Sequence, residues 1–179
     1  MHESGELCFN KLMNRSLVQP VETDMAFGGH AVKSCRVHDT VLDFIVSKAV
    51  QENFVTIIGV TGVINPDPLN KVRRLSLQND GEIPPGLVVS SVRSLHVFGR
   101  NVKIPSPSEF WLLRVVDYDE CEQLADDDLE GMGNLLHLKY LRFRHAHSIT
   151  ELPKELAKLQ HLEIDIHGHH KIMEILEII

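Results

Sequence analysis

Five short tracts in the C-terminal two thirds of the chain repeat one pattern of apolar positions, in which a second apolar residue follows after three positions and a third after two more. The tracts span residues 72–77, 92–97, 113–118, 138–143 and 159–164. Their middle apolar residues follow one another at steps of 20, 21, 25 and 21: Leu75, Leu95, Val116, Leu141 and Leu162. Leucine-rich repeats share this core pattern and have a period of roughly 20–29 residues. The pattern therefore predicts about five parallel strands, stacked so that strand side chains line a concave, partner-binding surface.

The segments between these tracts predict the other half of each repeat. Apolar residues at 124, 129, 132 and 135 are spaced for a short helix, and Pro153 followed by leucines at steps of three predicts a tight 3₁₀ or α-helical turn. Cys121 follows Tyr118 by three residues, where the repeat pattern places a buried Asn or Cys. We therefore assign residues 71–179 to leucine-rich repeats.

The first 57 residues follow a different pattern. The expected elements are a helix, a strand, a glycine-containing turn, a second strand and a second helix, at residues 6–14, 17–21, 27–30, 32–37 and from Thr40 onward. Thr40 and Asp43 have the spacing of a capping box at the start of that helix. This order predicts the end of a winged-helix module. Residues 58–70 contain two glycines and two prolines and are expected to form a linker. The predicted fold class is α/β, with a partial winged helix over residues 1–57 and a leucine-rich-repeat solenoid with a parallel β-sheet.

The composition limits the possible functions. The formal net charge is −7 and the basic residues are scattered along the sequence, which argues against a nucleic-acid partner. No apolar run reaches the roughly 18–20 residues that cross a bilayer, so we expect no membrane partner, and the N-terminus lacks the pattern of a signal peptide. The three cysteines are far apart and odd in number, which fits a reducing, cytoplasmic location: Cys8, Cys35 and Cys121.

Three features of the sequence could indicate cation, DNA or metal binding, but each also has a simpler structural explanation. The acidic run from Asp117 to Asp128 lacks the spacing of a calcium-binding loop, and we interpret it as a solvated face. A winged helix can bind DNA, but the expected hairpin tip at 22–24 is acidic. No nucleophile and base can be placed together, so we expect no enzymatic activity. Six histidines could bind a metal, but none stands at zinc-ligand spacing with cysteines, so we expect solvated loop histidines and no metal: His145, His147, His161, His167, His169 and His170.

Two parts of the chain resemble one protein family. Residues 7–57, from LCFNKLMNRSLVQPVE to CRVHDTVLDFIVSKAVQENFVTI, are similar to the end of the winged-helix region of plant nucleotide-binding leucine-rich-repeat immune receptors. The tracts KVRRLSLQND and LLHLKYLRFRHAHSITELPKELAKLQHLE resemble the first repeats of the coiled-coil branch of that family, particularly its cereal members. The resemblance implies that the chain is a fragment of such a receptor, running from the end of the winged helix into the first repeats.

The resemblance also implies one ligand contact. Val37-His38-Asp39 matches the Met-His-Asp motif of the family, in which the His faces the phosphates of bound ADP. His38 and Asp39 directly precede a predicted helix, whose free N–H groups attract anions. Asp39 is expected to cap the helix or hold the His38 side chain rather than approach the phosphate. The resemblance implies ADP or ATP as a cofactor of the intact receptor. The 179 residues of this chain contain no G-x-x-x-x-G-K-[ST] loop, so we expect no cofactor for this fragment.

What the resemblance implies about function is a role in the plant defence response, inside the cytoplasm. The repeats would recognise a pathogen effector or a host protein on the concave face and would pack on the receptor's own nucleotide-binding domain. Exchange of ADP for ATP would shift the receptor between two states. A free-standing repeat adaptor and a non-functional truncated gene product remain as alternatives. The tract Leu162-Glu163-Ile164-Asp165-Ile166 is one residue shorter than the family pattern, so the register of the last repeat stays open.

Overall fold

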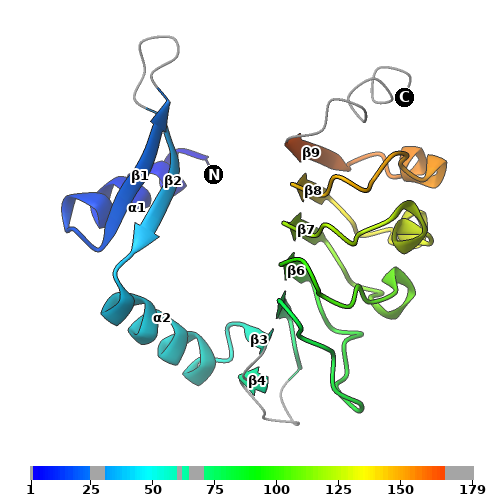
Figure 1. The fold of residues 1–179 in the computed structure, drawn as a ribbon, viewed down its shortest axis with the longest axis horizontal. Coiled ribbons are helices and arrows are strands. Elements are labelled where there is room, and N and C mark those ends of the chain that lie inside the picture. Colours follow the sequence, from blue (N-terminus) through cyan, green and yellow to red (C-terminus); the bar gives the residue numbers. More distant parts are fainter. Residues whose placement is uncertain (1, 25–30, 60–61, 65–70, 168–179) are drawn as a thin grey trace. The chain divides into compact units, whose positions relative to one another are not determined.

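The chain divides into two units, residues 1–49 and 50–179 (Figure 1). The structure, a computed structural model, describes residues 2–24, 31–59, 62–64 and 71–167. The first unit contains two helices and two strands: α1 (His2–Asn14), β1 (Val18–Asp24), β2 (Ala31–Val37) and α2 (Asp39–Gln51). β1 and β2 pair antiparallel, with a register irregularity after Pro20, which has no N–H to donate. The predicted order of helix, hairpin and helix is confirmed, and the turn predicted at 27–30 lies outside the described residues.

The start of α2 differs from the prediction. The first helical hydrogen bond runs from the Leu42 N–H to the His38 carbonyl over 2.8 Å, so the helix starts at Asp39 rather than after a Thr40 cap. The Thr40 N–H instead donates to Nδ1 of His38 over 3.3 Å. An imidazole nitrogen thus takes the capping role that we assigned to the Thr40 and Asp43 pair.

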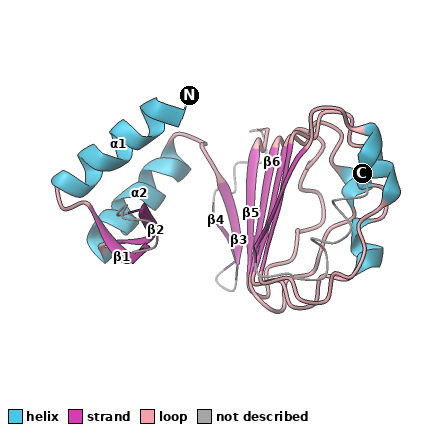
Figure 2. Cartoon of the chain, turned by 90° about the horizontal axis from the view of Figure 1, so that it is seen from above, coloured by secondary structure: helices cyan, strands magenta, loops and turns pink. Residues whose placement is uncertain are grey.

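The second unit is built on one sheet, with the strand order β4-β3-β5-β6-β7-β8-β9 among the described residues. All neighbouring strands pair in parallel except β3 and β4. Short 3₁₀ helices lie on one face of the sheet, as Figure 2 shows. The strands are β3 (Thr56–Gly59), β4 (Gly62–Ile64), β5 (Arg74–Gln78), β6 (Ser94–Phe98), β7 (Val115–Asp119), β8 (Tyr140–Arg144) and β9 (Glu163–His167). The 3₁₀ helices are η2 (Pro107–Glu109), η3 (Asp126–Leu129), η4 (Met132–Asn134) and η5 (Lys154–Lys158).

The apolar residues that the repeat pattern predicts for the core are buried in the structure. Leu75, Leu95, Val116 and Leu141 are register partners on successive strands, and each is at most 2% exposed. The apolar residues predicted to form a short helix are buried beside η3 and η4: Leu124, Leu129, Met132 and Leu135. The helical turn predicted after Pro153 is η5. The layered packing of strand leucines against these turns is the core of the solenoid.

The sheet begins earlier in the chain than we predicted. β3 pairs in parallel with β5, and Ile58, which is 2% exposed, is the register partner of Leu77. Residues 56 and 57, assigned to the winged-helix region, therefore belong to the sheet, as do Gly59 and β4 from the expected linker. Thr56, Ile57 and Ile58 favour a strand because two of them are isoleucines and the third is also β-branched. Within the described residues the sheet has six parallel strands rather than about five.

Each of the strands β5 to β8 is followed by a residue with left-handed backbone conformation. These residues are Asn79, Gly99, Glu120 and His145, with φ of 50°, 112°, 56° and 54°. The N–H groups of Asn79, Gly99 and Glu120 donate to the carbonyl oxygens of Phe98, Asp119 and Arg144 on the next strand over 2.8 to 3.0 Å. A glycine is needed most at position 99, because a Cβ there would lie 2.7 Å from Oδ1 of Asn79. A left-handed residue therefore ends each of these strands, and after β5, β6 and β7 it also extends the parallel ladder by one bond.

The register of the last repeat corrects the prediction for the fifth tract. Ile164, not Leu162, is the register partner of Leu141. The Leu162 N–H donates to the Leu159 carbonyl, as the Leu138 N–H does to Leu135, so Leu162 corresponds to Leu138. Lys139 separates Leu138 from β8, whereas Leu162 leads directly into β9. One residue is missing at this point, and the last step of the repeat is 23 residues when measured at Ile164.

Candidate interaction surface

The face of the sheet opposite the core carries three rows of side chains, which we call the open face. The rows follow from the strand register and run from β5 to β9. The first is Arg74, Ser94, Val115, Tyr140 and Glu163; the second is Ser76, His96, Asp117, Arg142 and Asp165; the third is Gln78, Phe98, Asp119, Arg144 and His167. These positions alternate along each strand with the core residues, because successive side chains point to opposite faces.

Arginines on β8 hold aspartates on β7 across the open face. Arg142 donates from Nε to Oδ1 of Asp117 over 3.0 Å and from Nη2 to Oδ2 over 2.5 Å. Arg144 donates from Nη2 to Oδ2 of Asp119 over 2.5 Å. Both aspartates are largely covered, with side chains 16% and 12% exposed. The hydrogen bonds to Asp117 raise the pKa of Arg142, so the guanidinium stays charged.

A third acidic group stands on β9. Oδ2 of Asp165 accepts a hydrogen bond from the Tyr140 hydroxyl over 2.8 Å, and Oδ1 lies 2.9 Å from Nε2 of His167. Partial burial, followed by the hydrogen bond to Asp165, raises the pKa of Tyr140. His96 and His145 lie 3.8 and 3.6 Å from Asp117 and Asp119 respectively. Every carboxylate of β7 and β9 on the second and third rows therefore has a cationic or hydroxyl neighbour.

This geometry corrects part of our interpretation of the acidic run as a solvated face, although Glu120, Glu122 and Asp127 are exposed as that interpretation predicts. Asp117 and Asp119 are paired on the open face, and Asp126 is a structural acceptor for the next repeat. Burial opposes ionisation of Asp126, but hydrogen bonds from the Thr150 hydroxyl and from the N–H groups of Thr150 and Glu151 outweigh it and lower its pKa. The sequence did contain a signal for the first two pairs, since Arg142 and Arg144 follow Asp117 and Asp119 by 25 residues, the step between Val116 and Leu141.

The two residues predicted to contact a nucleotide phosphate lie at the start of α2, and both are exposed. Nδ1 of His38 accepts the Thr40 N–H, so a neutral imidazole carries its proton on Nε2 and can donate from that nitrogen. Asp39 is the first residue of α2, where a negative charge is favourable near the helix start. Their role toward a nucleotide stays a prediction.

The thiol predicted to be buried is buried. Cys121 is 1% exposed, and its Sγ lies 3.4 Å from the carbonyl oxygens of Val97 and Asp119. Burial raises the pKa of this thiol to about 12, so it is a structural group rather than a nucleophile. Within the described part of the chain no three His, Cys, Asp or Glu side chains are grouped closely enough to hold a metal ion. His169 and His170 lie outside that part.

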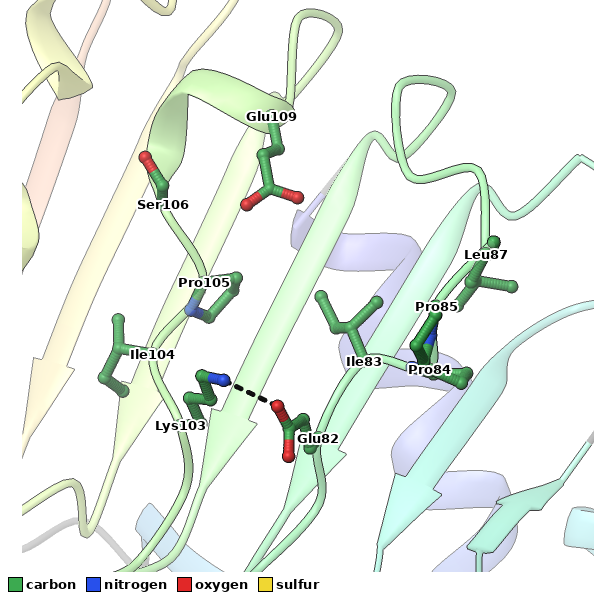
Figure 3. A pocket seen from close by; sticks show the side chains of 11 residues that line it. Glu82, Ile83, Pro84, Pro85, Leu87, Lys103, Ile104, Pro105, Ser106 and Glu109 are labelled. Atoms are coloured by element: carbon green, nitrogen blue, oxygen red, sulfur yellow. Dashed lines mark hydrogen bonds and ion pairs between the residues drawn. The ribbon is translucent and has the colours of Figure 1, made fainter.

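A cavity on the segments that follow β5 and β6 offers little for chemistry (Figure 3). Its polar centre is an ion pair between Lys103 Nζ and Glu82, 2.6 Å apart. Ile83, Pro84 and Ile104 supply apolar lining. The pair is already satisfied, and Glu109 is the other ionisable side chain among the lining residues. The open face, in contrast, displays fixed charges and hydrogen-bonding groups over five strands, an arrangement suited to recognising another protein.

Comparisons with known proteins agree with both units. The family model of the disease resistance protein winged helix domain matches residues 1–45, and that of a leucine-rich repeat region matches residues 91–175. Within the described residues, every helix is too short or too polar to cross a membrane.

Several plant proteins are similar over most of the chain. Disease resistance protein Pik-2 from Oryza sativa subsp. japonica is 37% identical over 164 residues, which are 89% of this chain and 16% of Pik-2. Disease resistance protein RGA4 from the same species is 36% identical over 160 residues, 87% of this chain and 15% of RGA4. Disease resistance protein RPH8A from Arabidopsis thaliana is 27% identical over 197 residues, 96% of this chain and 20% of that protein. The chain spans about a sixth of the length of the two rice proteins. Because the winged-helix and leucine-rich-repeat family models match this chain and the similar proteins are disease resistance proteins, the chain belongs to the plant disease resistance proteins.

Proposed function

We propose that this chain acts in plant immunity as the recognition part of a cytoplasmic receptor, and that its open face binds a pathogen effector or a host protein. The observation that carries the proposal is the set of cross-strand pairs on β7, β8 and β9. Arg142, Arg144 and Tyr140 are held in place by aspartates before any partner arrives. Side chains ordered in advance lose less conformational freedom on binding, which favours tight and specific recognition of a partner.

The N-terminal unit would couple recognition to a nucleotide. In this proposal a nucleotide-binding domain elsewhere in the receptor holds ADP, and Nε2 of His38 donates to a phosphate oxygen. The support is local: the Thr40 N–H already occupies Nδ1, so the proton of a neutral His38 is on the other nitrogen. Replacement of ADP by ATP would then shift the receptor from its inactive to its active state. Asp39 would contribute charge at the helix start rather than a phosphate contact.

A plant-line experiment tests the recognition role. Disruption of the gene should increase susceptibility to at least one member of a panel of pathogen isolates, and the wild-type gene should restore resistance. A gene carrying D117R and R142D together should fail to restore it, because the swap moves both charges on the open face while keeping an ion pair. The matched control is E82K with K103E, which swaps an exposed pair away from that face and should restore resistance fully.

Two outcomes would count against the proposal: disrupted lines that resist the whole panel as well as their parents do, or full restoration by the open-face swap. The alternative of a free-standing repeat adaptor shares the open-face prediction but requires no nucleotide. An in-frame sequence encoding G-x-x-x-x-G-K-[ST] upstream of Met1 would favour the receptor, and its absence from the transcript would favour the adaptor.

A further inference from the structure

A row of cations runs along the edge of the sheet where the strands begin. Arg73, Arg93, Arg114 and Lys139 each directly precede a strand, and we call these four residues the basic rim. The Arg93 N–H donates to the Arg73 carbonyl, Arg114 to Arg93 and Lys139 to Arg114, over 2.8, 2.8 and 2.9 Å. The four residues therefore occupy equivalent positions on successive repeats, and all four are exposed. The row ends at Lys139, because Leu162 directly precedes β9 and the last repeat has no residue equivalent to Lys139.

The basic rim differs electrostatically from the opposite edge of the sheet. At that edge, where the strands end, Arg100 pairs with Glu122 over 3.2 Å and Lys103 pairs with Glu82 over 2.6 Å. None of the four rim side chains forms an ion pair or side-chain hydrogen bond with another described residue. Four cations in a line without a partner among the described residues are unexpected in a chain with a net charge of −7. The line presents positive charge that the described residues leave uncompensated.

Exposed apolar side chains accompany the basic rim. Trp111 is 73% exposed and Leu136 is 81% exposed. They stand three residues before Arg114 and Lys139, at equivalent positions of neighbouring repeats. Both line one groove with Leu112 and His137, and Leu136 lines a second hollow with Lys139. Exposed apolar side chains that share one groove, as Trp111, Leu112 and Leu136 do, are a feature of surfaces that bind other proteins.

The geometry of the row selects the kind of partner. Neighbouring strands of a sheet are about 4.8 Å apart, so the row offers one cation at each such step. An α-helix rises about 5.4 Å per turn, and residues three or four apart share one of its faces. A stripe of carboxylates on a helix therefore matches the row closely over three turns. A single-stranded nucleic acid could stack a base on Trp111 but would offer no apolar group to Leu136.

We propose that the basic rim, together with Trp111 and Leu136, binds an amphipathic α-helix of a partner protein that carries a stripe of carboxylates beside an apolar stripe. This surface is distinct from the paired residues of the open face, and the proposal does not depend on what the open face binds. The carboxylates would lie along the row of cations, and the apolar stripe would cover the tryptophan and the leucine.

Trp111 is the only tryptophan in the chain, so its fluorescence reports directly on this surface. The probe is a synthetic 18-residue helix, free of tryptophan, with glutamates along one stripe and leucines along the next. Titration of the full chain with this peptide should shift the Trp111 emission to the blue, and 0.5 M salt should weaken the binding because exposed charges are screened. R93E with R114E should weaken it by at least about tenfold. R100E with K103E, the same number of reversals at the opposite edge, should leave the affinity within about twofold.

Circular dichroism and the urea midpoint verify that both double variants remain folded. The proposal is overturned if the peptide produces no shift at millimolar concentration, if a scrambled peptide of equal composition binds equally well, or if the two double variants lose affinity alike. Tighter binding of a 20-base oligonucleotide than of the striped peptide would also overturn it. The swap of Asp117 and Arg142 should leave peptide binding unchanged, so failure of this proposal is distinguishable from failure of the recognition role of the open face.

Discussion

Arg142 on β8 holds both carboxylate oxygens of Asp117 on β7, although the two residues are 25 positions apart in the chain. The same separation joins Arg144 to Asp119 and Tyr140 to Asp165. In the core beneath, Tyr118 stacks on Phe143 with their ring centroids 5.7 Å apart. The length of a repeat thus determines which polar residues of neighbouring strands pair on the open face and which apolar residues pack together in the core.

The pair of Arg142 and Asp117 should show energetic coupling. Replacing either residue with alanine leaves a partly covered charge without its partner and should lower the free energy of unfolding by roughly 1–2 kcal/mol. The double variant should lose about 1 kcal/mol less than the sum of the two single losses. Urea unfolding of the four proteins measures this coupling. Strictly additive losses would mean that the two hydrogen bonds contribute no net stability.

Two leucines five residues apart should respond very differently to truncation. Leu141 is fully buried, so Leu141→Ala leaves a cavity and should cost roughly 2–5 kcal/mol. Leu136 is 81% exposed, and Leu136→Ala should change stability by no more than about 0.5 kcal/mol. Thermal and urea unfolding provide the comparison. Equal losses at the two sites would contradict the packing of the repeat core.

The three cysteines should differ in reactivity. Cys8 and Cys35 are exposed, whereas Cys121 is buried and its pKa is raised to about 12. A folded state with a raised thiol pKa has almost no thiolate at pH 8, so iodoacetamide should modify two cysteines rapidly and the third only after unfolding. Mass spectrometry of intact and urea-treated protein counts the labels. Rapid triple labelling of the native chain would place Cys121 at the surface instead.

His38 should affect nucleotide retention where a nucleotide-binding domain is present. In a chimaera in which this chain replaces the matching segment of a full-length relative, His38→Ala removes the proposed donor to the phosphate. Bound ADP should then decrease and signalling should increase, as measured by nucleotide extraction and by leaf cell death. Thr40→Ala is the control, because its backbone N–H is kept. If ADP content and signalling both stay unchanged, His38 has no phosphate contact.

The periodic part of the fold was predictable and the local exceptions were not. Leucines at a regular step identify β5 to β8, because burial of a repeated face requires that spacing. β3 escaped notice since Thr56-Ile57-Ile58 lacks the repeat pattern and borders a stretch rich in glycine and proline. The cap of α2 was misassigned because a histidine nitrogen accepts the Thr40 N–H, a role more common for Ser, Thr, Asp or Asn. The basic rim became visible only when the hydrogen bonds aligned four cations that are 20, 21 and 25 residues apart in the chain.

The shortened approach to β9 bears on how this array can evolve. Removing one residue from within a strand would turn all later side chains of that strand over. Here the absent residue lies ahead of the strand, and Ile164 and Ile166 remain partners of Leu141 and Phe143. Small deletions are thus absorbed at the strand entrances. In this array the entrance to β9 can therefore be one residue shorter while the residue pairs of the core stay in register.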